Sequence, residues 1–182
     1  MRLVNEDPII ECPKKGDFTI IVDTREQYPY TFAGQNVIVK KLDEGDYSLE
    51  GFEKRIVWER KSLDDFIGTV VHNFDTFEKE LQRAQAIEDF NILIESNIID
   101  IYARKYYSQA HPHSILGRIC SIRQDYHIPC FLLGNRQLAQ NFLTRYFLRF
   151  IKREKEKERE EKRNARTIAI DLPLWPTNTG GC

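Results

Sequence analysis

The 182-residue sequence lacks a long apolar run, closely spaced cysteines and an apolar N-terminal leader. A helix that crosses a bilayer needs about 20 mostly apolar residues, and no stretch approaches that length, so we expect no membrane span. The cysteines stand far apart, at Cys12, Cys120, Cys130 and Cys182, which predicts neither a zinc site nor a disulfide framework. Residues 1–7 do not have the composition of a secretion signal. We therefore expect an intracellular protein with reduced thiols.

Net charge is also almost absent, because 27 Lys and Arg stand against 28 Asp and Glu. The total of −1 hides a division along the chain. Residues 1–100 carry 12 basic and 21 acidic groups, residues 101–153 carry 9 and 1, and residues 154–182 carry 6 and 6. Fields of this size matter locally, so the neutral total does not exclude a polyanionic partner.

The composition favours one folded domain with extensions, since 41% of the residues are hydrophobic and 12% are aromatic. Short β-branched runs predict strands at 18–22, 37–39, 46–49, 55–59, 90–94 and 130–133. Helical spacing predicts helices over 63–70 (capped by Ser62), 74–84, 98–107 and 114–126, and one long helix from about residue 135. Strands that alternate with helices indicate an α/β fold with a mixed central sheet flanked by helices.

The chain divides into an N-terminal extension (1–16), a main domain (17–151), a charged helical extension (152–166) and a tail (167–182). The long helix has an apolar face up to residue 151, which would pack on the sheet or on a partner. Residues 152–166 then hold 8 basic and 5 acidic groups at spacings that suit ion pairs along a helix. Since the acidic groups would repel phosphate, we interpret this extension as a solvated helix rather than a phosphate-binding arm.

The most informative pattern begins with Gly45 and Asp46 and continues, after twelve intervening residues, with Glu59, Arg60 and Lys61. Metal-assisted hydrolysis of a phosphodiester needs carboxylates that converge on a hard cation, with a nearby positive group. Alternation along a strand places Glu59 and Lys61 on one face, while Arg60 points away with its carbonyl oxygen still available. A predicted hairpin brings Asp46 to the strand beside Glu59.

A plainer explanation is that acid-x-Lys triplets are common on exposed strands, where they carry no chemistry. Two observations favour a site. Val57 and Trp58 give the strand a buried character, in which a cluster of charges is costly. Asp23 and Glu26 supply a second acidic cluster at the end of another strand.

The ordered motifs Ile21–Glu26, Gly45–Tyr47 and Glu59–Asp65 resemble those of the XPF/Mus81-type (ERCC4-domain) structure-specific endonucleases, whose pattern is GD…ERKxxxD. The resemblance continues through 77–81, 92–95 and 126–129, and it covers residues 18–150. Several motifs in the family's order are far more specific than any one of them. The chain resembles the compact bacterial, archaeal and phage members more than the large eukaryotic proteins.

The resemblance implies a restriction-endonuclease-like, or PD-(D/E)XK, nuclease domain in residues 17–151. It further implies Mg²⁺- or Mn²⁺-dependent cleavage of branched, forked or flap DNA, without a small-molecule cofactor or a membrane partner. The implied metal ligands are Asp23, Glu26, Asp46 and Glu59, the implied catalytic set is Asp23, Asp46, Glu59, Arg60 and Lys61, and Arg25 and Asp65 would support the substrate phosphate. Lys61 would position or activate water. Family members pair, so the resemblance also implies a homodimer or heterodimer.

Further contacts with DNA are expected from the basic window 101–153, because cations interleaved with tyrosines suit the DNA backbone. The residues are Arg104, Lys105, Arg118, Arg123, Arg136, Arg145, Arg149, Lys152 and Arg153, with Tyr102, Tyr106, Tyr107 and Tyr126. Roughly half of the cations are expected only to neutralise the acidic half. Arg118 and Arg123 are our candidates for substrate binding. We interpret His111 and His113 as a loop before a helix rather than a metal pair.

The sequence departs from the family in two places, and other functions stay open. Residues 71–77 contain no arginine where many members have one, and no tandem helix-hairpin-helix module follows, so we expect recognition by the core, a partner or a second subunit. One alternative is a catalytically silent DNA-binding subunit, and another is a junction resolvase or restriction-type nuclease with the same core. Asp46, Glu59 and Lys61 together favour activity, because a silent subunit has no chemical need for them.

Overall fold

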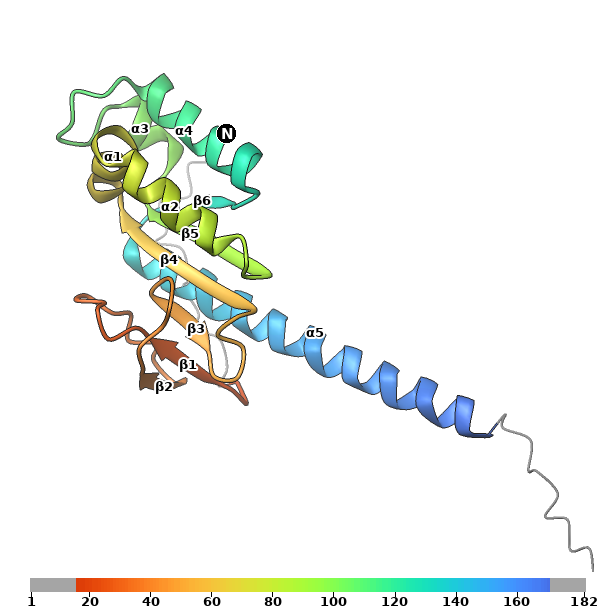
Figure 1. Cartoon of the computed structure of the whole chain (residues 1–182). Helices are drawn as coiled ribbons and strands as arrows, with labels where there is room; N and C mark the ends of the chain where they lie inside the picture. Colours follow the sequence, from red (N-terminus) through yellow and green to blue (C-terminus); the bar gives the residue numbers. More distant parts are fainter. Residues whose placement is uncertain (1–15, 171–182) are drawn as a thin grey trace, which may run out of the picture. The chain divides into compact units, whose positions relative to one another are not determined.

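The computed structural model describes residues 16–170, which fold around a six-stranded sheet (Figure 1). The strands are β1 (Thr19–Val22), β2 (Asn36–Val39), β3 (Tyr47–Leu49), β4 (Ile56–Ser62), β5 (Asp89–Glu95) and β6 (Cys130–Leu132). Their order across the sheet is β2-β1-β3-β4-β5-β6. β3 is antiparallel to β1 and β4, and the other neighbours are parallel. The mixed α/β sheet that the sequence predicts is confirmed.

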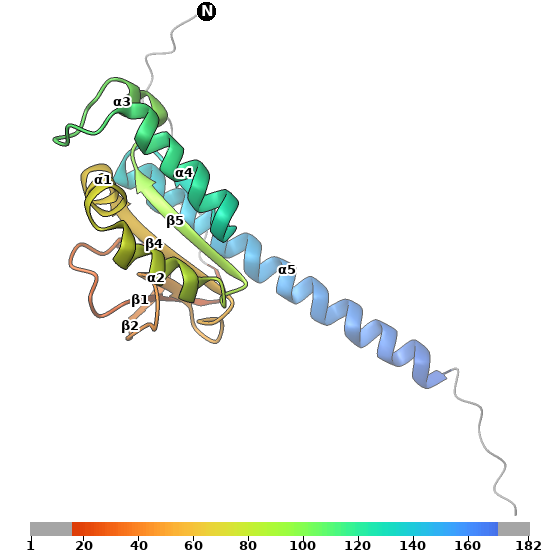
Figure 2. The same ribbon diagram turned by 45° about the horizontal axis from the view of Figure 1, so that its top comes forward.

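Helices cover both faces of the sheet. They are α1 (Leu63–His72), α2 (Phe74–Ala84), α3 (Ile98–Tyr102), α4 (Pro112–Tyr126) and α5 (Arg136–Ile170). Apolar side chains of α1, α2 and α4 pack in one cluster with Val57, Ile92 and Ile94, and these helices lie together on one face (Figure 2). Ile92 and Ile94 are two residues apart on one strand, so they point to the same side of the sheet.

The first turns of α5 pack on the opposite face. Trp58 is fully buried there, and its ring lies 6.0 Å from the ring of Phe142 and 4.9 Å from that of Tyr146, between centroids. The Tyr146 hydroxyl donates a hydrogen bond of 3.0 Å to the carboxylate of Asp89, at the start of β5. β4 therefore lies between two layers of helices, and its successive side chains face different layers.

β4 continues into α1 without a loop. Ser62 is the last residue of β4 and the N-cap of α1, where its hydroxyl accepts a hydrogen bond of 3.1 Å from the Asp65 N–H. A serine cap satisfies one of the N–H groups that have no partner in the first turn of a helix. The predicted cap is confirmed, and it holds the carboxyl end of β4 in place.

Three boundaries differ from the sequence expectation by three residues or more. β4 reaches Ser62 rather than residue 59, because its pairing with β5 continues to that point. α3 ends at Tyr102 rather than 107, because Arg104 has a left-handed φ of 53° and the Lys105 N–H then bonds the Asp100 oxygen at 2.9 Å. α5 continues to residue 170, so the predicted tail (167–182) begins as helix. Residues 171–182 of that tail, and 1–15 of the predicted N-terminal extension, lie outside the described residues.

The chain separates into two compact units, Met1–Tyr146 and Phe147–Cys182. In its described part, the second unit is the remainder of α5, where ion pairs such as Lys157 with Glu154, at 3.0 Å, join successive turns. The charged helix predicted for residues 152–166 is thus helical and ion-paired. Within residues 16–170, we find no helix with the length and apolar character that a membrane span requires.

Candidate active site

Asp46 and Glu59 lie opposite each other on the hairpin formed by β3 and β4. Tyr47 pairs with Trp58, and continuing this antiparallel register by one residue places Asp46 beside Glu59. The Asp46 N–H donates to the Trp58 oxygen at 2.8 Å, and the Asp46 carboxylate accepts from the Arg60 N–H at 2.7 Å. Residues directly opposite on antiparallel strands have Cβ atoms about 5 Å apart and share a face. The two carboxylates are therefore neighbours, as the sequence predicts.

Gly45 permits this approach. Its φ of 74° lies in the left-handed region, which side chains disfavour. A Cβ atom at this position would also lie 2.3 Å from Val57 Cγ1 and 3.1 Å from the Trp58 oxygen. Any other residue would push the chain away from β4 and would move Asp46 away from Glu59.

Lys61 is the cation of this pair of acids. Its Nζ donates to Glu59 Oε1 at 2.9 Å and lies 5.4 Å from the centroid of the Phe77 ring. Burial alone would lower the pKa of Lys61, but the charge and the hydrogen bond of Glu59 outweigh it, and the pKa is raised. The raised pKa favours the protonated ammonium form of Lys61, which can donate a hydrogen bond to water or phosphate.

Asp46 has no comparable cation. Burial, followed by the charge of Glu59, raises the pKa of Asp46 to about 7. A carboxyl group with such a shift would ionise more readily if a cation joined the site. Asp46 and Glu59 thus form a pair with an incompletely neutralised negative charge.

Asp23 is nearby but fully engaged. Its side chain is 1% exposed, one oxygen accepts from the Arg25 N–H and Nε at 2.8 and 2.7 Å, and the other accepts from the Leu42 N–H at 2.6 Å. Burial opposes the ionisation of Asp23, but these hydrogen bonds lower its pKa below the usual value. The contact with Asp23, reinforced by the charges of Asp46 and Glu59, raises the pKa of Arg25. Asp23 therefore holds Arg25 close to the acid pair.

Glu26 is engaged as well, on the other face of β4. Arg60 contacts Glu26 through Nε at 3.2 Å and Nη2 at 3.3 Å, and it contacts Glu95 through Nη1 at 3.2 Å. Glu95 also accepts a hydrogen bond of 2.7 Å from the Tyr30 hydroxyl and pairs with Arg136 at 3.4 Å. The Arg60 side chain points away from Glu59 and Lys61, as the alternation predicts, and its guanidinium group pairs with the carboxylates of Glu26 and Glu95.

Two acids near the predicted site were missing from the sequence-based set. Glu80, on α2, lies close enough to Glu59 that burial and the charge of Glu59 raise its pKa. Glu95 ends β5, which runs parallel to β4. Both belong to segments that resemble the family, and the rule that parallel strands end at the same edge could have found Glu95. Glu80 could have been found only from its spacing of three from the buried Phe77 on a helix.

The three other predicted substrate contacts are placed differently from one another. Asp65 bonds the Ser62 hydroxyl at 2.7 Å, at the start of α1. Arg118 stacks over the Phe74 ring at 4.0 Å, on the side of the sheet that Glu59 and Lys61 face. Arg123 donates to the His127 oxygen at 2.8 Å. Asp65 also lines a pocket with Arg60 and Glu95, on the other face of β4 from the acid pair, so the structure does not group the three predicted contacts in one place.

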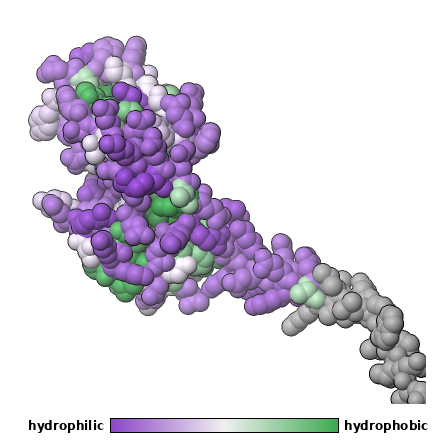
Figure 3. Space-filling view, in the orientation of Figure 1, coloured by the Kyte–Doolittle hydropathy of each residue, from purple (hydrophilic) through white to green (hydrophobic). Residues whose placement is uncertain are grey.

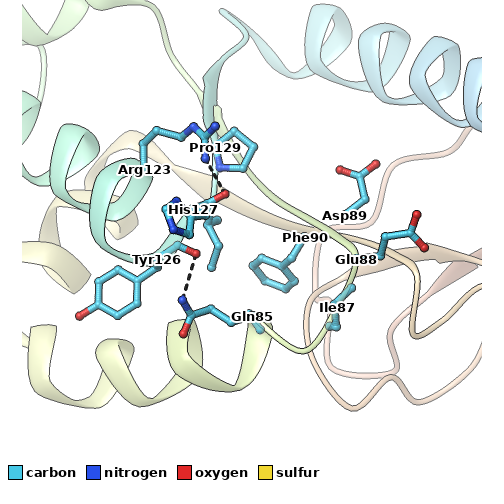
Figure 4. A pocket seen from close by; sticks show the side chains of 11 residues that line it. Gln85, Ile87, Glu88, Asp89, Phe90, Arg123, Tyr126, His127 and Pro129 are labelled. Carbon is cyan, nitrogen blue, oxygen red and sulfur yellow. Dashed lines mark hydrogen bonds between the residues drawn. The ribbon is translucent and has the colours of Figure 1, made fainter.

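Arg123 lies at the far end of the sheet. It lines a pocket of about 380 Å³ with Asp89, Tyr126 and His127 (Figure 4). β4 and β5 are parallel, with Ile56 beside Asp89, so this pocket adjoins the amino ends of the two strands. Glu59 and Lys61 lie toward the carboxyl ends. The structure does not bring Arg123 together with the acid pair.

The acid pair has the chemistry of a magnesium site, although no group of three or more His, Cys, Asp or Glu side chains within residues 16–170 is arranged to enclose a metal ion. Mg²⁺ is commonly bound by one or two carboxylates, with waters and substrate phosphate completing its shell. Asp46 and Glu59 supply two hard oxygen donors and the unbalanced charge described above. The residues present therefore fit a divalent ion that is held jointly with substrate.

A mixed sheet with an acid pair and a lysine toward the end of β4 defines a restriction-endonuclease-like nuclease core. The family model described as "ERCC4 domain" matches residues 22–146, and the chain belongs to that family of structure-specific DNA nucleases. No curated protein matches the sequence.

Several solved structures share the fold, among them the following two. XPF from Aeropyrum pernix matches with a TM-score of 0.60 and 21% identity over 78% of this chain and 69% of that one. XPF from Aeropyrum pernix in complex with DNA matches with a TM-score of 0.59 and 22% identity over 75% of this chain and 66% of that one. At these identities the likeness establishes the fold alone.

Proposed function

We propose that the chain is a metal-dependent endodeoxyribonuclease that hydrolyses phosphodiester bonds in branched, forked or flap DNA. One observation carries this proposal: Asp46 and Glu59 lie side by side, and within residues 16–170 Lys61 is the only cation that forms an ion pair with them, so the pair stays short of positive charge. A bound Mg²⁺ or Mn²⁺ supplies a water of lowered pKa and neutralises charge on the phosphoryl oxygens.

The residues of the site have separate roles in this proposal. Asp46 and Glu59 hold the ion through their carboxylate oxygens. Lys61, a protonated ammonium group on the same face, orients the attacking water and stabilises the phosphorane. Arg25, 60% exposed and fixed by Asp23, is placed to contact the substrate phosphate. No covalent intermediate with the protein is needed.

Asp23, Glu26 and Arg60 surround the acid pair but are engaged in contacts of their own. Asp23 and Glu26 can join the ligand set only by giving up their contacts with Leu42, Arg25 or Arg60. Arg60 contributes its backbone N–H to Asp46, which fixes the orientation of that carboxylate. Asp65, in the first turn of α1, accepts a hydrogen bond from the capping Ser62 hydroxyl and would support the substrate from there. Arg118 is a candidate contact with DNA on the side of the sheet that Glu59 and Lys61 face, and Arg123 one for a more distant part of the duplex.

The family supports DNA as the partner, since its members are structure-specific DNA nucleases and a DNA complex of the Aeropyrum pernix protein has this fold. We extend the proposal to a homodimer or heterodimer as the working assembly. A silent DNA-binding subunit is the competing function.

The test is cleavage of forked, flapped and plain duplex DNA with and without Mg²⁺, by the wild type and by Asp46→Ala. Loss of ion-assisted catalysis is worth several kcal/mol, so we expect the rate of Asp46→Ala to fall about 1000-fold. Asp43→Ala removes an exposed acid from the same loop and should cut like the wild type. If wild type and variant both bind DNA and neither cuts it, the silent subunit is the correct function. Equal cutting by both removes Asp46 from the mechanism.

A further inference from the structure

Large apolar side chains are exposed together just after β5. Ile98, Ile99 and Tyr102 on α3 are 49%, 69% and 57% exposed, and Tyr107 in the following loop is 94% exposed. Figure 3 shows apolar surface within the otherwise hydrophilic end of the first unit that carries α3. We call these four residues the exposed patch. Clustered apolar exposure of this kind marks a binding surface more often than isolated exposed residues do.

The patch is held in a defined conformation. Tyr106 packs on the core cluster, and its hydroxyl donates to the Ala110 oxygen at 2.9 Å. The next residue, Tyr107, donates its N–H to Asp64 Oδ1 at 2.8 Å. Lys105 bonds Asp100 through both its N–H, at 2.9 Å, and its ammonium group, at 3.0 Å. Tyr106 is therefore packed on the core cluster, whereas the ring of Tyr107, the next residue, is exposed to solvent.

The hydrogen bond to Asp64 ties the patch to the first turn of α1, which follows β4 directly. Asp64 follows Lys61 by three residues, so their Cα atoms are at most ~11 Å apart. A strand whose phosphate lies between Asp46 and Glu59 would pass Tyr107 within a few nucleotides.

The chemistry of the patch suits bases rather than phosphates. Aromatic side chains with adjacent cations bind single-stranded nucleic acid by stacking, and they tolerate any sequence because every base has a flat face. Arg104 is exposed beside the tyrosines, and within residues 16–170 its guanidinium group makes no hydrogen bond or ion pair. Bases in an intact duplex are stacked on one another and present no free face to Tyr107.

We propose that Tyr107 and Tyr102 stack on unpaired bases of the DNA strand that enters the active site, with Arg104 contacting the adjoining phosphates. The inference rests on the proposed function and deepens it, since it assigns the recognition of an unpaired arm to a named surface of the core. The exposed isoleucines of α3 extend the apolar floor on which those bases lie.

The test measures binding of the full chain, without divalent ions, to a fork with one unpaired arm and to a plain duplex of equal length. Fluorescence anisotropy gives the Kd, and 2-aminopurine placed in the unpaired arm reports stacking. For Tyr107→Ala we expect the Kd for the fork to rise about tenfold, within the range measured for loss of one stacked base, with an unchanged Kd for duplex. Tyr107→Phe keeps the ring and should bind the fork like the wild type. Val39→Ala, on the exposed edge strand β2, removes an apolar side chain that is 70% exposed and should have no effect.

Several outcomes would overturn the inference: Tyr107→Ala binds the fork as the wild type does, Tyr107→Phe binds it as weakly as Tyr107→Ala, or fork and duplex weaken equally. So would conversion of a dimer into a monomer by Tyr107→Ala in sedimentation, because the patch would then be a subunit interface. The same experiments distinguish failure of this inference from failure of the proposed nuclease function. A wild type that binds forks through Tyr107 but never cuts them with Mg²⁺ refutes the nuclease and keeps the inference, whereas cutting without dependence on Tyr107 does the reverse.

Discussion

The two faces of β4 carry the same kinds of groups in different states. On one face Asp46 and Glu59 have Lys61 beside them, and on the other Glu26 and Glu95 have Arg60. Each set contains two carboxylates and a cation from β4, and Glu95 in the second set also pairs with Arg136 at 3.4 Å. In the second set Arg60 bonds both acids, and we call this side of β4 the closed face. In the first set Lys61 bonds only Glu59, and we call that side the open face.

The shape of the cation explains this difference. A guanidinium group is a planar fork with five N–H donors, so Arg60 can bind two carboxylates at once, whereas the ammonium group of Lys61 is a compact point charge. Asp46 is left with the backbone N–H of Arg60, and its pKa is raised to about 7 by burial and by Glu59. The closed face stabilises the fold, and the open face is where a cation and a phosphate can enter.

The largest expected effect is the loss of cleavage on the open face. Glu59→Gln should reduce the rate of DNA cleavage about 1000-fold, because it removes one of the two charged oxygen ligands and about 4 kcal/mol of transition-state stabilisation. The measurement is the single-turnover rate on forked DNA with Mg²⁺. Glu95→Gln makes the same substitution on the closed face and should cut within about tenfold of the wild type. Equal losses in the two variants would show that the faces do not differ in function.

On the closed face the expected effect is on stability. Arg60→Ala leaves Glu26 as an uncompensated, largely buried charge and leaves Glu95 with only its longer contact to Arg136, and breaking a buried ion pair in this way costs about 3 kcal/mol or more. Urea denaturation followed by circular dichroism should show the decrease in the free energy of unfolding. Lys61→Ala, on the open face, should cost clearly less, and the comparison breaks if the two variants are equally unstable.

Removal of charge from the open face should stabilise the metal-free protein. Asp46→Asn relieves the repulsion from Glu59, and we expect a gain of about 1 kcal/mol in the free energy of unfolding in EDTA, of the size common for relief of a strained functional site. Mg²⁺ binds the folded wild type and should raise its Tm, but it should not raise that of Asp46→Asn. An equal rise in both proteins would place the ion elsewhere.

The smallest effect is expected at Glu80. Its charge adds to the field at Glu59 from α2, so Glu80→Gln should raise the Mg²⁺ concentration that gives half-maximal cleavage by about threefold to tenfold, the lower end of effects from groups outside the ligand shell. Asp75→Asn, an exposed acid at the start of the same helix, is the matched control. If Asp75→Asn raised the required Mg²⁺ concentration as much as Glu80→Gln did, the cause would be a disturbance of α2 rather than the loss of the Glu80 charge.

Local patterns made much of the site predictable. Glu59 and Lys61 share a face and Arg60 points away because side chains alternate along any strand. Asp46 meets Glu59 because a short hairpin sets the register between its strands. The serine cap and the buried strands follow from equally local rules. Where a left-handed residue such as Arg104 ends a helix early, the same rules failed, since a positive φ at an arginine has no signature in sequence.

Long-range contacts escaped prediction. Glu26 and Glu95 meet on Arg60 from segments more than 30 residues away on either side, and no periodicity encodes that meeting. Nor does composition reveal that Arg123 lies at the opposite end of the sheet, since charge windows record position along the chain and not in space.

The sequence by itself determined the family, the order of most strands and helices, and the pairing of Asp46 with Glu59, because those depend on neighbours in the chain and across one turn. Only the tertiary structure decided which charges are already neutralised. The fold pairs Arg60 with two acids, Glu26 and Glu95, but it places no cation in contact with the Asp46 carboxylate within residues 16–170. Ion pairing and burial depend on which distant segments pack together, so local sequence patterns do not encode them.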